Sequence, residues 1–292
     1  MALVGKSGSG KTTLIKCIYG LEDLHGGEVT ILNELVTGPA FNLIPGNKHM
    51  SLVSQDFYVL DNHTVHENIT DKLIGYTDEA KNKRSAQLLK LLDLFPLKDT
   101  KARFLSSGQK QRVAIARALA IIPKLLLLDE PFSNLDRILT DKLYDFINKE
   151  VKRNKTAVVL ITHQVEDALK YADRISILDA GKIVQTGEKW KVYYKPKNTK
   201  LAGLLGEYNI IRKEDIEKGS QAKIPSKIIL RPDKIAVNPG KDTLKIPLII
   251  TNCTYNGKCY EVLAETRNGY TVVFYSSKEI SGSKEMMAYL KV

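Results

Sequence analysis

The sequence is poor in cysteine and has no long apolar run. Its three cysteines, Cys17, Cys253 and Cys259, make no disulfide framework in a chain of 292 residues, so we expect reduced thiols. The apolar runs at residues 125–128 and 157–161 fall far short of the roughly 20 residues that cross a bilayer. No apolar stretch behind a basic start suggests a signal peptide. A membrane role would therefore depend on a partner chain.

Acidic residues are in the minority, with 33 Asp and Glu against 44 Lys and Arg. A net charge of +11 is compatible with nucleic acid, an anionic membrane face, nucleotide phosphates or a solvated lysine-rich surface. We favour the solvated surface and expect no nucleic-acid partner, because the charge is spread: residues 198–292 hold 15 basic and 10 acidic residues. With 43% hydrophobic and 26% charged residues, the composition excludes a disordered chain.

Two patterns divide the sequence. Residues 1–195 alternate short apolar runs with helical patterns, which is typical of an α/β domain with a mainly parallel sheet. Residues 196–225 contain several glycines and prolines and predict a linker. Residues 226–292 hold short strand-like runs around two Asn-Gly pairs, which favour two-residue hairpin turns and a small barrel or sandwich.

The beginning of the chain matches the phosphate-binding pattern G-x-x-x-x-G-K-[ST]. Its glycines let backbone N–H groups face phosphate oxygens, and the helix that follows adds the positive end of its dipole. Lys11 would reach the β- and γ-phosphates, and the Thr12 hydroxyl would ligate Mg²⁺. The nucleotide-binding candidates here are Gly5, Lys6, Ser7, Gly8, Ser9, Gly10, Lys11, Thr12 and Thr13.

A second feature is a pair of acids after an apolar run. Leu125 to Leu128 predicts a buried strand, and Asp129 and Glu130 follow at its tip. Asp129 would hold Mg²⁺ directly or through water, and Glu130 would orient or deprotonate an attacking water. Two solvated acids after a strand are the alternative interpretation, which the upstream phosphate loop makes much less attractive.

A third feature is a polar loop that leads into an alanine-rich helix. Leu105-Ser106-Ser107-Gly108-Gln109 places hydroxyls and free N–H groups at a helix start, where an anion would bind. Two anion sites for one nucleotide suggest that a neighbouring copy completes each site. A plain helix cap by Ser106 or Ser107 is the other interpretation.

In this order, the motifs resemble those of the ATP-binding subunits of ABC transporters. The first is similar to Walker A, the second to Walker B and the third to the LSGGQ signature. Gln55 matches the Q-loop, residues 133–136 match the D-loop, and Thr162-His163 matches the H-loop. The resemblance covers residues 3 to about 190 and implies a P-loop ATPase fold, an α/β cassette with a helical subdomain.

The resemblance also implies roles for individual residues. Gln55 would sense the γ-phosphate and the metal, Glu130 would be the catalytic carboxylate, and His163 would hold the transition state. Asp136 would lie at the seam of an ATP-bound homodimer. The signature residues Ser106, Ser107, Gly108 and Gln109 would face ATP held by the opposite protomer. The implied cofactors are ATP and Mg²⁺, with Thr12, Gln55 and Asp129 as metal ligands.

The chain departs from the family pattern at two places. Ser107 replaces the first glycine of the signature, where a Cβ would crowd the nucleotide or constrain φ. Met1 lies only four residues before Gly5, whereas family members carry further strands and an adenine-stacking aromatic before Walker A. We therefore expect a cassette truncated at its N-terminus, from a mis-called start or a truncated gene.

The C-terminal part narrows the transporter class. Residues 229–235 resemble the I-R-P-E-x-I element of the TOBE domain, a small β-barrel of importers for polyamines, ferric iron, sulfate, molybdate and sugars. Residues 204–209 resemble the corresponding segment of the polyamine and iron group. The resemblance thus implies an import ATPase for a small solute, such as spermidine or putrescine. It would work at the cytoplasmic face of the inner membrane, with two permease subunits and an extracytoplasmic substrate-binding protein.

Two other functions remain open. A soluble ABC ATPase acting on nucleic acid or ribosomes would use the positive charge, but such proteins usually carry paired cassettes, coiled-coil insertions or zinc sites, and none of these is evident here. A remnant that does not hydrolyse ATP is the other. ATP turnover that is lost on Glu130→Gln would eliminate it.

Overall fold

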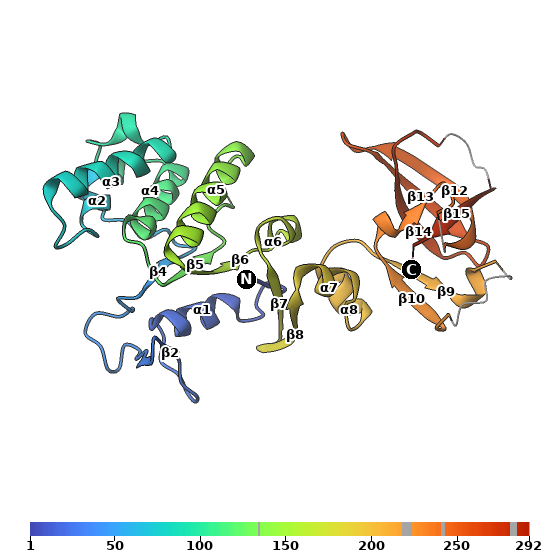
Figure 1. Ribbon diagram of the computed structural model, residues 1–292, viewed down its shortest axis with the longest axis horizontal. Helices are drawn as coiled ribbons and strands as arrows, with labels where there is room; N and C mark the ends of the chain where they lie inside the picture. The colour runs from blue at the N-terminus through green and yellow to red at the C-terminus, as the bar shows by residue number, and fades with distance from the viewer. Residues whose placement is uncertain (134, 218–223, 241–242, 281–284, 292) are drawn as a thin grey trace. The chain divides into compact units, whose positions relative to one another are not determined.

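The computed structural model describes residues 1–133, 135–217, 224–240, 243–280 and 285–291. This chain divides into two compact units, Met1–Thr186 and Gly187–Val292, which are described separately (Figure 1). The first unit carries every residue that the sequence predicts for nucleotide binding and catalysis. In the described part of the chain, each helix is too short or too polar to cross a bilayer.

The first unit is built on a six-stranded sheet in the order β4-β5-β6-β1-β7-β8. Neighbouring strands from β4 through β7 run parallel, so their carboxyl ends meet at one edge. This arrangement confirms the predicted α/β class with a mainly parallel sheet. The strands are β1 (Ala2–Val4), β4 (Met50–Val53), β5 (Leu125–Asp129), β6 (Ala157–Ile161), β7 (Arg174–Asp179) and β8 (Lys182–Glu188).

Alternation along β5 divides the core between the two faces of the sheet. Leu127 packs in one cluster with Ile15 of helix α1, whereas Leu126 and Leu128 pack in another with Leu143 of helix α5. Both faces are therefore covered by helices, which explains why β5 is a continuous apolar run. Helix α1 spans Lys11–Tyr19, α5 spans Arg137–Asn154, and α6 spans Val165–Tyr171.

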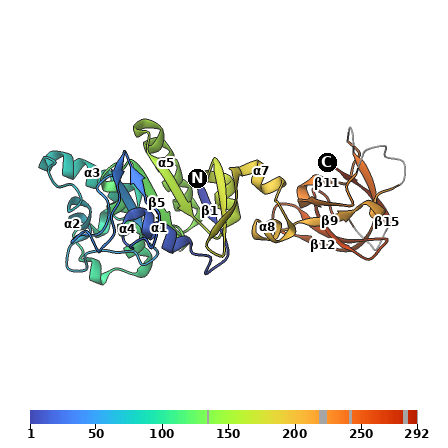
Figure 2. The ribbon, with the colours of Figure 1, turned by 90° about the horizontal axis from the view of Figure 1, so that it is seen from below.

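A group of helices lies between β4 and β5 in the sequence. Helices α2, α3 and α4 pack against one another and share the apolar cluster that α5 joins (Figures 1 and 2). Each begins at a side-chain cap, from Thr64, Thr77 and Ser106 respectively. The bounds are α2 (Val65–Thr70), α3 (Asp78–Leu91), η1 (Phe95–Leu97), η2 (Ala102–Phe104) and α4 (Ser107–Ala120), with a small hairpin of β2 (Thr30–Ile31) and β3 (Glu34–Leu35) earlier in the chain.

The second unit is a small β structure preceded by two short helices. Its five-stranded antiparallel sheet has the order β11-β15-β12-β13-β14, and β14 returns beside β11, so the sheet forms a nearly closed barrel. The barrel confirms the predicted fold of the C-terminal part. Its elements are α7 (Lys189–Tyr194), α8 (Thr199–Leu204), β9 (Asn209–Arg212), η3 (Lys213–Asp215), β10 (Lys227–Leu230), η4 (Pro232–Lys234), β11 (Ile235–Ala236), β12 (Leu244–Tyr255), β13 (Tyr260–Thr266), β14 (Thr271–Ser276) and β15 (Glu285–Leu290). The segment 196–225 contains α8, β9 and η3, while the proposed domain boundaries stay a prediction.

Both Asn-Gly pairs lie in hairpins, but in neither hairpin do they form the two central residues of a two-residue turn. Four residues separate β12 from β13, and the Asn256 side chain accepts bonds from two N–H groups within that loop. After β13, Gly269 adopts a φ of 78°, and its N–H donates to the carbonyl of Thr266. The bond from the N–H of Asn256 to the carbonyl of Cys259, at 3.0 Å, encloses Gly257 and Lys258, whereas the bond from the N–H of Thr266 to the carbonyl of Tyr270 encloses three residues. The prediction that each Asn-Gly pair forms the turn itself was therefore wrong, because side-chain bonds to the loop backbone stabilise other connections.

Arg231 ties the barrel to the segment before it. Its side chain is 2% exposed. Its Nε donates to the carbonyl of Tyr193 at 3.0 Å, and Nη1 donates to those of Ala202, Gly206 and Glu207 at 2.8–3.1 Å. Burial lowers the pKa of this guanidinium. The arginine that carried the resemblance to a TOBE element is therefore a structural centre of the second unit.

Residues 189–200 hold five lysines, Trp190 and two tyrosines, with no acidic residue. The expectation of evenly spread charge missed this local concentration. Lys189 lies over the Trp190 ring and Lys234 over the Tyr194 ring, at 5.4 and 4.3 Å. The Tyr194 hydroxyl donates to Asp233 at 2.9 Å. Burial and this bond raise the pKa of Tyr194 to about 12.

Candidate functional site

The candidate site lies at the carboxyl edge of the parallel sheet. The phosphate loop follows β1, Asp129 ends β5, and Gln55 and His163 follow the ends of β4 and β6 by two residues. The register pairs Val53 with Leu128, and Asp129 with Ile161, so these strand ends are level. Residues from four separate parts of the sequence thus meet at one edge, which is where ligands bind in open parallel sheets.

The phosphate loop has a backbone that requires glycine. Gly8 and Gly10 have φ angles of 75° and 97°, in the left-handed region that side chains disfavour. A Cβ on Gly5 would lie 2.3 Å from the carbonyl oxygen of Leu178 on β7. Lys11 is 8% exposed, and its Nζ donates to the carbonyls of Gly5 and Lys6 at 3.0 and 2.9 Å. The loop therefore holds an ammonium group at the start of α1, beside N–H groups without helical partners.

Asp129 is almost fully buried, with 1% exposure. Burial raises the pKa of this carboxyl group, and a hydrogen bond with Thr12 partly opposes the rise. Among the residues that the structure describes, its Oδ1 atom has no hydrogen-bond partner. A buried carboxylate oxygen without a partner, next to a threonine hydroxyl, is an arrangement that a hard cation would satisfy.

Glu130 and His163 form a second pair at the same edge. His163 Nδ1 lies 3.3 Å from Glu130 Oε2, and both side chains are partly exposed. Glu130 has a φ of 47°, uncommon for a residue with a side chain, and its N–H donates to the carbonyl of Ile161 at 3.1 Å. Contact with β6 thus holds Glu130 in a strained conformation beside an imidazole, as expected where function requires one geometry.

The predicted signature loop forms the start of α4. Ser106 is the N-cap, and its Oγ accepts from the N–H of Gln109 at 3.3 Å. The Gln109 side chain accepts from the N–H of Ser106 at 2.9 Å, which completes a capping box. In the described residues, no hydrogen bond or ion pair joins this loop to the phosphate loop. Within a single chain, Ser106 therefore acts as a helix cap, as the alternative interpretation of this loop expected.

Comparison with known proteins assigns the family. The model of the family described as "ABC transporter" matches residues 1–133. The chain is 33% identical over 246 residues to an Fe(3+) ions import ATP-binding protein of Haemophilus influenzae, covering 83% of this chain and 69% of that protein. It is 33% identical to a sulfate/thiosulfate import ATP-binding protein of Nocardia farcinica, covering 98% of this chain and 85% of the relative.

The chain belongs to the ATP-binding subunits of ABC transporters, of the importer type. A solved structure agrees: a dimeric ATP-binding cassette in a post-hydrolysis state, bound to ADP and Pi, superposes with a TM-score of 0.57 at 29% identity. That match covers 64% of this chain and 84% of the other. The expectation of an ABC-type ATPase coupled to transport is thereby confirmed.

The backbone of this ABC cassette accommodates the serine at position 107 of the signature without strain. Ser107 is the first residue of α4, outside the set of residues with positive φ, so its side chain strains no backbone angle. A Cβ on Gly108 would meet no atom of the described residues within 4 Å. Of the two ways in which Ser107 would disturb the signature, the backbone constraint is therefore excluded, and only crowding of a ligand remains.

The residues at the edge of the sheet fit Mg²⁺ and the phosphates of ATP. Thr12 and the unpartnered Oδ1 of Asp129 are suitable oxygen donors for the metal. When bound, Mg²⁺ would neutralise phosphate charge. Gln55 is exposed two residues beyond β4, at the same edge. Lys11 would exchange its two carbonyl partners for phosphate oxygens.

An ion pair between Arg137 and Asp167, which the sequence patterns did not predict, joins the segment after the D-loop to the segment after the H-loop. Asp136 caps α5, and Arg137 donates to Asp167 of α6 at 2.9 Å. Asp167 is 6% exposed and lines a small cavity together with Glu130 and His163. No local signal marks such a pair, because its two members lie in different helices. Asn134, within the predicted D-loop, lies outside the described residues.

Proposed function

We propose that this ABC cassette hydrolyses ATP between two copies of itself and so drives uptake of a small solute through partner permease subunits. One observation carries the proposal: five side chains of this chain meet at one edge of the sheet, namely Lys11, Thr12, Asp129, Glu130 and His163. The chain is also related to an import ATP-binding protein. The match to an importer over 98% of the chain includes the barrel as well as the cassette.

Each residue has a distinct task in this proposal. Lys11 and the N–H groups of the phosphate loop bind the β- and γ-phosphates, and Thr12, Asp129 and Gln55 hold the metal. Glu130 accepts a hydrogen bond from the attacking water and orients it. His163, 3.3 Å from Glu130, fixes that carboxylate and donates to the γ-phosphate. Catalysis then depends on position and charge compensation.

A second copy would complete the site. In the described residues, the signature residues make no hydrogen bond or ion pair with the phosphate loop of their own chain, and the space beside Gly108 is open. Ser106, Ser107, Gly108 and Gln109 would therefore face ATP on the opposite copy, with Asp136 at the seam. A solved cassette that resembles this chain is dimeric, which supports the arrangement.

The remaining partners follow from the import reaction. Two permease subunits would dock near Gln55 and helices α2 and α3, and a substrate-binding protein would deliver the solute from outside. The cassette would lie at the cytoplasmic face of the membrane. We propose a polyamine as the solute, because one relative is named for import of spermidine and putrescine. Ferric iron, sulfate or thiosulfate, and methionine, for which other relatives are named, are the competing candidates.

ATP turnover by the purified chain tests the enzymatic part. We expect Glu130→Gln to lower turnover at least about 100-fold while ADP binding stays unchanged, since Glu130 acts only in hydrolysis. Unchanged ATP turnover in the Glu130→Gln variant would refute the role of Glu130. For the solute, the cassette reconstituted with its permeases in vesicles should accumulate labelled spermidine and not sulfate; the reverse result would refute the polyamine.

A further inference from the structure

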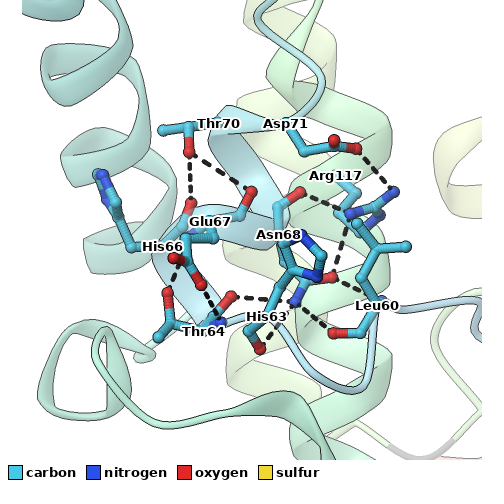
Figure 3. A network of polar contacts seen from close by, with 9 residues as sticks. All are labelled: Leu60, His63, Thr64, His66, Glu67, Asn68, Thr70, Asp71 and Arg117. Carbon is cyan, nitrogen blue, oxygen red and sulfur yellow. Dashed lines mark hydrogen bonds and ion pairs between the residues drawn. The ribbon is translucent and has the colours of Figure 1, made fainter.

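A buried polar cluster joins two parts of the cassette: residues 55–60, called here the Gln55 segment, and helix α4, which begins at the signature loop. We propose that Asn68 and Arg117 form a bridge that sets the position of the signature loop relative to Gln55 (Figure 3). They are positioning residues, because neither lies at the sheet edge where nucleotide would bind. The inference rests on the proposed function, in which the signature completes the site of a second copy.

Asn68 fixes the end of the segment after Gln55. It is fully buried at the centre of α2. Its Oδ1 accepts from the N–H of Leu60 at 2.8 Å, and its Nδ2 donates to the Leu60 carbonyl at 3.0 Å. The same Nδ2 donates to the carbonyls of His63 and Thr64. One amide thus holds both backbone groups of Leu60, five residues beyond Gln55, as a neighbouring strand would.

Arg117 connects this amide to α4. Its side chain is 5% exposed, and Nη1 donates to the carbonyl and to Oδ1 of Asn68 at 2.8 and 3.1 Å. Nη2 lies 3.4 Å from Oδ2 of Asp71, and the guanidinium carbon lies 5.9 Å from the centre of the Tyr58 ring. Figure 3 shows the guanidinium of Arg117 directed at Asn68 and Asp71. The side chain therefore contacts α2 and the segment immediately after Gln55.

Helix α4 transmits this constraint to the signature. It is continuous from Ser107 to Ala120, so Arg117 and Ser107 lie on one rod, separated by about 15 Å at 1.5 Å per residue. An exposed pair, Lys110 with Asp61 at 2.8 Å, links the two segments again but is only weakly stabilising. The buried bridge is therefore the stronger connection between the Gln55 segment and Ser106.

The test separates binding to a chain's own phosphate loop from pairing of two chains. In the full chain carrying Glu130→Gln, ATP should produce a dimer that sedimentation velocity detects. Adding Arg117→Met should weaken this ATP-dependent dimer at least about tenfold. Affinity for ADP, which needs only the chain's own phosphate loop, should change less than about twofold.

Arg84→Met is the matched control for a loss of helix contacts. Arg84 binds the same C-terminal end of α4 as Arg117, through the carbonyls of Leu119 and Ala120, but its other partner is Glu150 at 3.3 Å and not the Gln55 segment. We expect it to lower the unfolding temperature as Arg117→Met does and to leave the dimer unchanged. Equal weakening by both variants, or by neither, would overturn the bridge.

Two further variants keep the proposal testable if Arg117→Met does not fold. Asn68→Ala removes the bonds to Leu60 but leaves the backbone carbonyl that Arg117 binds, and it should weaken the dimer as well. In the double variant Gln55→Ala/Asn68→Ala, the fold-loss of dimer affinity should be smaller than the product of the two single-variant losses, because both residues act through one connection. Full additivity would overturn the bridge. A Glu130→Gln chain without further substitutions that stays monomeric with ATP would instead refute the proposed function, and the bridge with it.

Discussion

Gly108 offers a test in which stability and function should move in opposite directions. It lies in the first turn of α4 with an ordinary φ, and a Cβ at this position would meet no atom within 4 Å in the part of the chain that the structure describes. Gly108→Ala removes freedom from the unfolded chain without strain in the folded one, so it should stabilise the first unit by about 0.4–1 kcal/mol. For a unit of this size the unfolding temperature should rise by about 1–4 °C.

The same methyl group should impair pairing of two chains. If the open space beside Gly108 receives ATP bound to another copy, the substitution should weaken the ATP-dependent dimer of the Glu130→Gln chain at least about tenfold, with ADP affinity unchanged. Thermal unfolding without nucleotide, ADP titration and sedimentation velocity measure the three quantities. A lower unfolding temperature, or a dimer as tight as before, would refute the reasoning.

Gly5→Ala is the contrasting control. Its Cβ would lie 2.3 Å from the carbonyl oxygen of Leu178 and 2.8 Å from Ser9 Oγ, so the backbone must shift. We expect a loss of roughly 1–3 kcal/mol in the free energy of unfolding, together with weaker ADP binding. The two glycines would then be required for different reasons: Gly5 because a side chain would clash with its own chain, and Gly108 because a side chain would obstruct ATP bound to a second copy.

Three further predictions concern single side chains. Burial raises the pKa of Tyr194 to about 12, so the folded state favours its neutral phenol. This stabilisation is complete below pH 10 and disappears as the pH rises through 12. Denaturant unfolding of Tyr194→Phe should therefore show a flatter decline of the unfolding free energy over that pH range. Arg231→Met removes four hydrogen bonds from a buried guanidinium to backbone carbonyls and should destabilise the second unit by about 3 kcal/mol in denaturant unfolding. Arg267→Met, at an exposed ion pair, should change the unfolding free energy by less than about 1 kcal/mol, and equal losses would contradict this account. Asp136→Ala removes the cap on the N–H of Leu139 and should cost about 1 kcal/mol, whereas Asp136→Asn keeps the cap; ATP turnover that falls in both variants would place Asp136 at the dimer seam, and turnover that follows stability alone would exclude it.

Local patterns in the sequence predicted much of this protein. The glycines of the phosphate loop, the apolar run before Asp129 and the capping residues of α4 each act within a few residues, so their spacing identifies them. The strand-rich C-terminal part was also evident from its runs and turns. The Asn-Gly pairs were predicted at the wrong place in its hairpin turns, because side-chain bonds such as those of Asn256 decide the turn and leave no pattern in the sequence.

Other features depend on contacts between distant segments. The order of the strands sets Glu130 beside His163, and the fold alone brings Arg137 to Asp167. Asn68 and Arg117 are 49 residues apart and become partners only because α2 packs on α4. Local periodicity records which residues are apolar and which chemistry a loop carries. It contains no information on which buried polar groups pair, since that pairing exists only after burial removes water as the alternative partner.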